Sequence, residues 1–280
     1  MDTSQARNTV ISVRVDDETS RTIDLLVQAG LAQSRSEAVA QLVALGINAA
    51  GELLAQAKQL AENLQRLKGE MFAAVKAKDI EGVKALLDHD PNLLRLWSEG
   101  GDTPILLSAY YGAQEVTRLL LERGVELNLF EAAAVGEVER VQQLLDADPT
   151  QINTYSHDGW TPLHLAAFFG HREVAQLLAQ RGADIAARSR NATSNLPLHA
   201  ALAGRRFDIA QLLVMHGSNV NIQDSYGWTA LHHAAYSGNM TMVELLLTNG
   251  AKLNVKNNKG QTPLQIAIER HYSDVAERLR

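Results

Sequence analysis

Nine histidines are the largest supply of side chains in this 280-residue sequence that could hold a metal or transfer a proton. Three of them, His164, His199 and His232, occupy the last position of a recurring Thr-Pro-Leu-His type tetrapeptide. No cysteine is present and no cluster of carboxylates at ligand spacing accompanies them, so we expect structural roles and no metal or cofactor. His232 and His233 point to different faces of a helix and do not form a ligand pair.

Catalytic motifs are missing from the sequence. It contains no Gly-rich phosphate loop, no Gly-x-Ser-x-Gly elbow and no His-Glu-x-x-His pair. Pairs such as Asp158-Gly159 have the composition of turns and not of acid–base sites. The absence of cysteine also excludes a thiol nucleophile and a disulfide scaffold. We therefore expect a protein that is not an enzyme.

The overall composition is that of a folded, cytoplasmic protein. The chain is 46% hydrophobic and 21% charged, with a mean hydropathy of -0.14. No apolar run reaches the roughly 18 residues that a membrane span needs, and no signal peptide is visible, so we expect no membrane contact. The net charge of -6 argues against a large continuous basic surface for nucleic acid.

A tetrapeptide repeat organises most of the chain. Copies begin at Thr103, Thr161, Leu196, Thr229 and Thr262, the last three of them 33 residues apart. Where a copy has Thr and Pro, the Thr can cap a helix whose first turn holds the Pro. An aliphatic run that begins 13 residues after the end of the tetrapeptide can form a second helix. Gly then ends the second helix in a left-handed conformation. One such helix pair cannot bury its own apolar side, so the pairs must stack.

These units resemble the ankyrin repeat, and residues 158–184 are close to its consensus. Residues 70–280 hold about seven units, two of them degenerate, so the resemblance implies an ankyrin solenoid of about seven helix pairs in a mainly α protein. It also implies that the imidazole of the tetrapeptide bridges the turn backbones of neighbouring units. Gly112 and Gly136 are only 24 residues apart, which predicts that the connection between their units lacks the usual extended turn.

Aromatic residues gather at two positions of these units. In ankyrin proteins the residues at the end of each first helix line a concave groove, and the residue before the Thr lies on a protruding turn. Exposed aromatic patches are typical anchors of protein interfaces. The resemblance therefore implies an unidentified protein partner on the concave face, bound by Tyr110, Tyr111, Trp160, Phe168, Phe169, Tyr226, Trp228 and Tyr236. The alternative is that several of these rings pack between adjacent units.

The first 49 residues follow a different pattern. Residues 10–15 predict a half-buried strand, with Ile11, Val13 and Val15 on one face and Val10, Ser12 and Arg14 on the other. Such a strand needs a second strand to pair with. Acidic residues then begin a helix that Gly30 ends, and Ser34-Arg35-Ser36-Glu37 is a capping box that opens another.

Strand, helix and helix in this order resemble the ribbon-helix-helix domain of dimeric bacterial DNA-binding regulators. The resemblance implies a homodimer through residues 9–49, with Val10, Ser12 and Arg14 facing the major groove and Ser34, Arg35 and Ser36 holding a DNA phosphate. Residues 1–50 carry four basic and six acidic side chains, which weakens attraction to DNA.

Residues 50–69 predict a linker helix between residues 1–49 and 70–280. Its apolar side chains form a heptad seam of Leu53, Ala57, Leu60, Leu64, Leu67 and Met71. This seam either extends the dimer as a short coiled coil or packs on the first ankyrin unit. The sequence as a whole predicts a protein-binding scaffold fused to a dimeric DNA-binding regulator. The alternative is a bivalent adaptor whose N-terminal module only dimerises.

Overall fold

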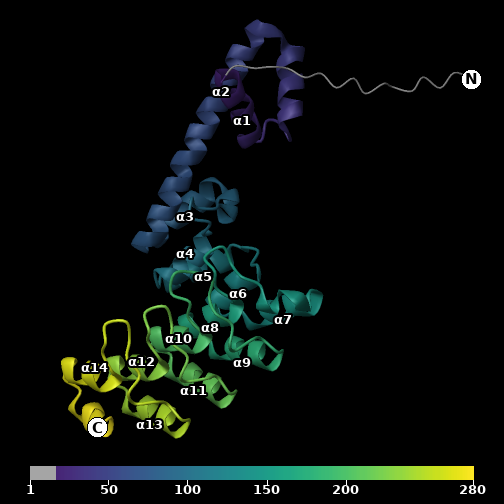
Figure 1. The fold of residues 1–280 in the computed structure, drawn as a ribbon. Helices are drawn as coiled ribbons and strands as arrows, with labels where there is room; N and C mark the ends of the chain where they lie inside the picture. The colour runs from purple at the N-terminus through teal and green to yellow at the C-terminus, as the bar shows by residue number, and fades with distance from the viewer. Residues whose placement is uncertain (1–16) are drawn as a thin grey trace, which may run out of the picture. The chain divides into compact units, whose positions relative to one another are not determined.

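The computed structural model describes residues 17–280, with the backbone alone for residues 44–52. All regular elements in this range are helices (Figure 1). The strand predicted for residues 10–15 lies outside the described residues. The chain divides into two compact units, Met1–Glu70 and Met71–Arg280.

Two helices build the described part of the first unit. Helix α1 (Asp17–Gln28) begins with two acidic residues, and α2 (Arg35–Ala77) begins after Ser34. The hydroxyl of Ser34 accepts a hydrogen bond from the backbone N–H of Glu37 at 3.2 Å. The Glu37 carboxylate in turn accepts one from the N–H of Gln33 at 2.7 Å. The capping residues expected from the sequence therefore do cap α2, although the carboxylate reaches one residue further back than in a standard capping box.

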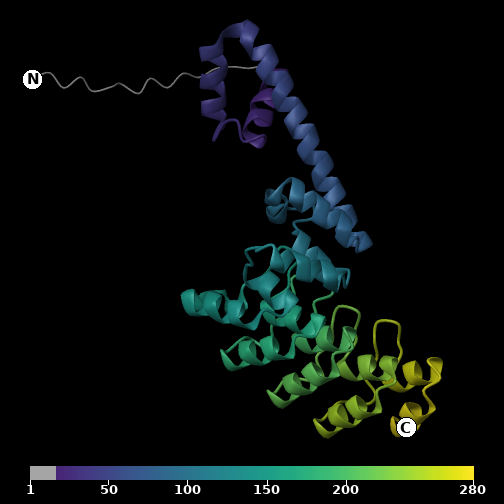
Figure 2. The same ribbon diagram turned by 180° about the vertical axis from the view of Figure 1, so that it is seen from behind.

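The separate linker helix predicted for residues 50–69 is wrong in its boundaries, because α2 runs without a break from Arg35 to Ala77. Its ribbon turns back on itself, so that the segments just before and just after the turn both lie beside α1 (Figure 2). Accordingly, Ala38 and Ala57 share one buried cluster with Ile23 and Leu26 of α1. Ala57 of the heptad seam thus packs inside the first unit, a role that neither interpretation of the seam included, whereas Leu60 is 49% exposed.

The second unit is a stack of helix pairs. Its first pair joins the last turns of α2 to α3, and α4 to α15 form six more pairs, which confirms the expected solenoid of seven. Figure 1 shows these pairs lying side by side in chain order. The elements are α3 (Ile80–His89), α4 (Pro104–Tyr110), α5 (Gln114–Glu122), α6 (Leu129–Val135), α7 (Val138–Ala147), α8 (Pro162–Phe169), α9 (Arg172–Gln180), α10 (Pro197–Ala203), α11 (Phe207–Met215), α12 (Ala230–Ser237), α13 (Met240–Thr248), α14 (Pro263–Glu269) and α15 (Ser273–Arg278), with 3-10 turns at Pro91–Arg95 and Pro149–Asn153.

Buried histidines join neighbouring units of the stack. The Nδ1 atom of His164 accepts a hydrogen bond from the N–H of Thr161 at 3.3 Å, and its Nε2 lies 2.9 Å from the carbonyl oxygen of Asn195 in the next loop. His199 and His232 repeat this arrangement with the carbonyls of Ile222 and Gln261, at 3.1 and 3.2 Å. The predicted bridging role is confirmed. Since Nδ1 accepts and Nε2 donates, each ring is held as the neutral imidazole.

One connection between units is much shorter than the others. Six residues join α5 to α6, whereas 14 to 16 residues join the second helix of every other pair to the next first helix. Asn128 and Glu131 form a capping box that starts α6 directly, and Glu131 also accepts a hydrogen bond from the hydroxyl of Thr103 at 2.5 Å. The missing turn predicted from the spacing of Gly112 and Gly136 is therefore confirmed.

Candidate functional site

Two groups of aromatic rings lie on what we call the first-helix face, formed by α4, α6, α8, α10, α12 and α14 with the loops before them. The first group is a chain of rings in edge contact. Tyr110 meets Phe169 with ring centroids 5.1 Å apart, Phe169 meets Phe168 at 5.2 Å, and Phe168 meets Trp160 at 5.5 Å. Phe168, Phe169 and Trp160 are half-buried, and Tyr110 is 37% exposed. The chain of rings forms a rigid ridge that is only partly covered.

The short connection explains how Tyr110 of α4 reaches Phe169 of α8 across an intervening unit. The small, buried residue Ala134 stands at the corresponding place in α6. With no long loop in between, the Tyr110 hydroxyl also donates a hydrogen bond to Asp158. Burial, followed by this bond to a carboxylate, raises the pKa of Tyr110 far above its ordinary value.

The second group of rings is centred on Trp228. Its ring centroid lies 5.6 Å from that of Tyr236 and 5.0 Å from that of His233, and His233 in turn stacks on His199 at 5.7 Å. Tyr236 is 47% exposed, whereas Trp228 is half-buried. As in the first group, packing between rings fixes their rotamers, so little side-chain entropy remains to be lost on binding.

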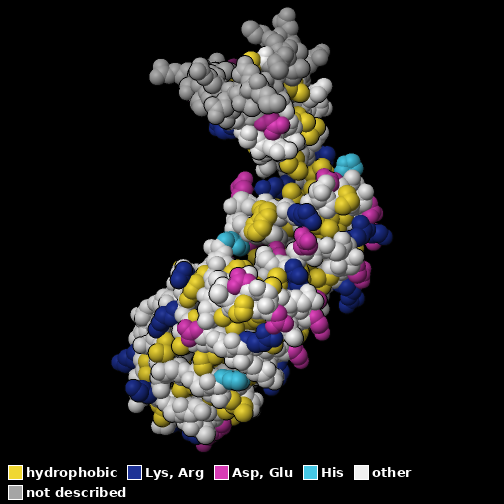
Figure 3. Space-filling view, turned by 90° about the vertical axis from the view of Figure 1, so that its right-hand side faces the viewer, with side chains coloured by type: hydrophobic (Ala, Val, Ile, Leu, Met, Phe, Trp, Pro, Cys, Tyr) yellow, Lys and Arg dark blue, Asp and Glu magenta, His cyan; other side chains and the backbone are white. Residues whose placement is uncertain are grey.

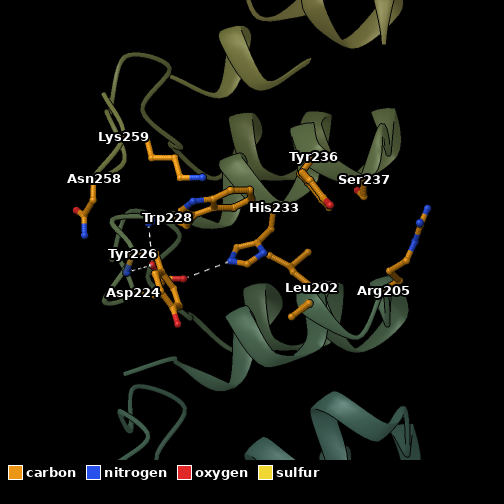
Figure 4. Close-up of a pocket in the computed structure, with 11 residues that line it drawn as sticks. Leu202, Arg205, Asp224, Tyr226, Trp228, His233, Tyr236, Ser237, Asn258 and Lys259 are labelled. Atoms are coloured by element: carbon orange, nitrogen blue, oxygen red, sulfur yellow. Dashed lines mark hydrogen bonds and ion pairs between the residues drawn. The ribbon is translucent and has the colours of Figure 1, made fainter. Parts of the chain in front are cut away.

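A pocket of about 480 Å³ opens beside Trp228 (Figure 4). It is formed by α10, α12 and the two loops that precede α12 and α14, and we call it the Trp228 pocket. The lining combines aliphatic residues of α10, aromatic residues of α12 and of the loop before it, and polar or charged residues around them: Leu202, Ala203, Arg205, Asp224, Tyr226, Trp228, His233, Tyr236, Ser237, Asn258 and Lys259. A pocket of this size and composition is within the range of ordinary binding pockets.

Asp224 organises the loop wall of this pocket. One carboxylate oxygen accepts the N–H groups of Tyr226 and Trp228 at 2.9 and 2.8 Å, and the other lies 3.6 Å from Nε2 of His233. Burial raises the pKa of Asp224, but the contacts with His233 and Trp228 outweigh burial and leave the pKa below its ordinary value. Asp224 is therefore held in place as a carboxylate by groups of the protein itself.

The eight residues predicted to bind a partner differ in exposure and in whether they belong to one of the two groups of rings. Tyr226 is 57% exposed beside Trp228, and Tyr111, at the end of α4, is 45% exposed and belongs to neither group of rings. Sequence reasoning missed His233 and also Trp97, which is 55% exposed in the loop before α4. Trp97 stands in its loop where Tyr155 stands before α8, six residues ahead of the capping Thr, and that alignment could have revealed it.

The residues predicted for DNA contact fall into two sets. Val10, Ser12 and Arg14 lie outside the described residues. Ser34 and Ser36 are exposed at the start of α2, while the guanidinium of Arg35 forms an ion pair with Asp24 at 2.8 Å and a hydrogen bond with Ser20. Arg35 is thus engaged within its own chain.

Two other observations concern the classes of site expected to be absent. Among the described residues no group of three or more His, Cys, Asp or Glu side chains could hold a metal ion. No helix in the same range is long and apolar enough to span a membrane.

On the face of the second unit seen in Figure 3, acidic and basic side chains are both present and interspersed with apolar ones.

Comparison with known proteins assigns the second unit to a family. A family model described as ankyrin repeats in three copies matches residues 129–224 and 198–280, and a single ankyrin repeat matches residues 100–130. The probable 26S proteasome regulatory subunit p28 of Saccharomyces cerevisiae is 33% identical over 171 residues, which cover 56% of this chain and 74% of that protein. The ankyrin repeat protein nuc-2 of Neurospora crassa is 26% identical, over 63% of this chain and 20% of its own length.

The probable E3 ubiquitin-protein ligase XBOS32 of Oryza sativa is 30% identical over 61% of this chain, and this chain covers only 35% of it. This chain thus covers only a small part of nuc-2 and of XBOS32, and the similarity concerns the repeats. Residues 100–280 match the ankyrin family models and contain the capped helix pairs and the bridging histidines, so the chain belongs to the ankyrin-repeat family.

Proposed function

We propose that this protein is a non-enzymatic scaffold that binds a protein partner on its first-helix face. The observation that carries the proposal is the presence there of two preorganised groups of partly exposed rings, one along Tyr110, Phe169, Phe168 and Trp160 and one around Trp228. Large, rigid aromatic side chains at the centre of a surface contribute most of the binding energy in protein interfaces. The yeast relative bears the name of a regulatory subunit of a larger assembly, which accords with such a role.

Removing rings from either group should weaken partner binding by about 30-fold or more, because truncated anchor residues commonly cost 2 kcal/mol or more. The variants are Trp160→Ala/Phe168→Ala and Trp228→Ala/Tyr236→Ala. The partner is first identified by crosslinking to the wild-type protein and mass spectrometry, and its affinity for each variant is then measured by calorimetry. Met215→Ala is the matched control, because Met215 is 76% exposed on α11 and belongs to neither group. Unchanged affinity in both double variants, with an intact helical signal, would refute the proposal.

We further propose that residues 9–49 dimerise the protein and place it on DNA. Support comes from the order of α1, a short turn and a capped α2, together with the exposed Ser34 and Ser36 at the start of α2. The second candidate is a bivalent adaptor without DNA binding. It is favoured by the ion pair of Arg35 with Asp24 and by the net negative charge of residues 1–50.

A gel-shift experiment at 50 and 200 mM salt separates these two candidates. The DNA-binding form should shift a fragment of its own promoter at low salt and release it at high salt, and Ser12→Ala/Arg14→Ala should abolish the shift. Light scattering on the same samples should report a dimer in both cases. A dimer that never shifts DNA establishes the adaptor, and a monomer of about 31 kDa contradicts both candidates.

A further inference from the structure

The Trp228 pocket combines an apolar interior with uncompensated positive charge at its edge. Arg205, at the end of α10, and Lys259, in the loop before α14, both line the pocket. Within the described part of the chain neither side chain forms an ion pair. The guanidinium of Arg270 adds a third positive charge nearby, 4.4 Å above the ring of Tyr236. Figure 4 shows Lys259 and Arg205 at opposite sides of Trp228 and His233.

Two carboxylates lie in or beside the pocket, and in the described part of the chain neither forms an ion pair with these cations. Asp224 is the one carboxylate in the lining; one of its oxygens accepts two backbone N–H groups, and the other lies 3.6 Å from Nε2 of His233. Glu269, which precedes Arg270, accepts two hydrogen bonds from the side-chain amide of Gln261, at 2.7 and 2.8 Å. The three cations Arg205, Lys259 and Arg270 therefore outnumber the two carboxylates Asp224 and Glu269 in and beside the pocket.

The charge of the surrounding repeats has the same sign. Residues 181–280 hold eleven basic and seven acidic side chains, a formal charge of +4, whereas residues 1–180 hold 15 and 25, a formal charge of -10. The three C-terminal units are thus a basic region in an otherwise acidic protein. Such a region attracts acidic segments over distances of about 10 Å and steers their approach.

We propose that the Trp228 pocket binds one large apolar side chain of an acidic protein segment, whose carboxylates flank that side chain and meet Arg205 and Lys259. The proposal rests on the proposed function and adds to it the kind of segment that is bound. The apolar side chain enters between Trp228, Tyr236 and Leu202, and the flanking carboxylates remain at the solvent-exposed edge. Burial of the anchor provides most of the affinity, and the edge charges provide the selectivity.

The test uses the full chain and a set of fluorescein-labelled nine-residue peptides. Each peptide has a central Trp, Phe or Leu, flanked on both sides by Glu and Asp, by Ser and Gly, or by Lys. Binding is measured by fluorescence anisotropy at 50 and 200 mM salt. The acidic peptides should bind at least about 10-fold more tightly than the lysine peptides at low salt, and this ratio should shrink at high salt.

Charge reversal at the edge gives the decisive variant. Arg205→Glu/Lys259→Glu should invert the preference toward the lysine peptides, while Lys252→Glu/Arg280→Glu, which makes the same change in charge outside the pocket, should keep the acidic preference. Trp228→Ala should weaken the binding of all peptides, because it removes the wall on which the anchor packs.

Equal binding of acidic and lysine peptides, or no peptide bound at 100 µM protein, would overturn this inference. Binding that depends on Trp228 but shows no charge preference would refute this inference and leave the proposed scaffold function intact. The scaffold function itself would be refuted only if partner affinity were unchanged in both aromatic double variants.

Discussion

Lowering the pH from 7 to 5 should remove about 4 kcal/mol from the free energy of unfolding of the repeat array. The cause is the pair of fully buried rings His164 and His199. Burial lowers the pKa of His164 to about 4, and burial together with the charge of His233 lowers that of His199 to about 3. In the unfolded chain both rings titrate near 6.5.

The sign follows from which state binds the proton. Between pH 6.5 and about 4 the unfolded chain takes up protons on these two rings and the folded chain does not, so acid favours unfolding. Each ring contributes about 2 kcal/mol to the loss at pH 5, and the loss continues until the pH falls through the pKa of the folded state. Burial also lowers the pKa of His232, and of His171, so these rings act in the same direction.

Urea denaturation followed by circular dichroism at pH 7 and pH 5 measures the effect. His164→Gln/His199→Gln should start from a lower stability at pH 7 and lose about 4 kcal/mol less between the two pH values, because glutamine does not titrate. Gln265 shows that the exchange is tolerated locally, since its side-chain oxygen accepts the N–H of Thr262 at 2.8 Å in the last unit. His216→Gln, which removes an exposed histidine, controls for the substitution itself. If the double variant and the wild type lost the same free energy on acidification, the buried rings would not be the cause.

The parts of the fold that could be predicted are those that local chemistry determines. Thr161 and Pro162 specify a helix start by capping and by a fixed φ, and Gly182 specifies the end of the next helix by its φ of +87°. The histidine bridges recur because each unit repeats the same local geometry. Even the missing turn before α6 was visible in the sequence, because it only requires counting residues between Gly112 and Gly136.

The parts that could not be predicted depend on tertiary contacts that the local sequence pattern does not specify. The contact of Asp224 with His233 arises from the way one loop closes over α12, and neither residue type nor spacing encodes it. The contact of Tyr110 with Phe169 joins α4 and α8, two helices that belong to units with a third unit between them in the chain. Ala57 likewise packs with Ile23 and Leu26 of α1, a contact that the heptad pattern does not specify.

Gly204→Ala should destabilise the repeat array by about 3 kcal/mol, although the backbone conformation of Gly204 suits alanine. Its φ is -75°, so alanine would by itself stabilise the folded state slightly by reducing the entropy of the unfolded chain. A Cβ atom at this position, however, would overlap the carbonyl oxygen of Phe168 and lie 3.2 Å from its carbonyl carbon. These are backbone atoms of α8, so the contact cannot be relieved by a change of rotamer.

The steric term should outweigh the entropic one because α8 and α10 can separate only by losing packing along their whole interface. Separation would also break the hydrogen bond from Nε of Arg206 to the Phe168 carbonyl, 3.3 Å long, and would shift the ring of Phe168 within the first aromatic group. Urea denaturation of Gly204→Ala should therefore show a lower midpoint, together with weaker partner binding. Gly100→Ala is the matched control, since its nearest neighbours would lie at an ordinary 3.6 Å from the new Cβ, and it should leave stability within about 1 kcal/mol of wild type. Equal midpoints for the two variants would mean that α8 and α10 are not held at this close approach.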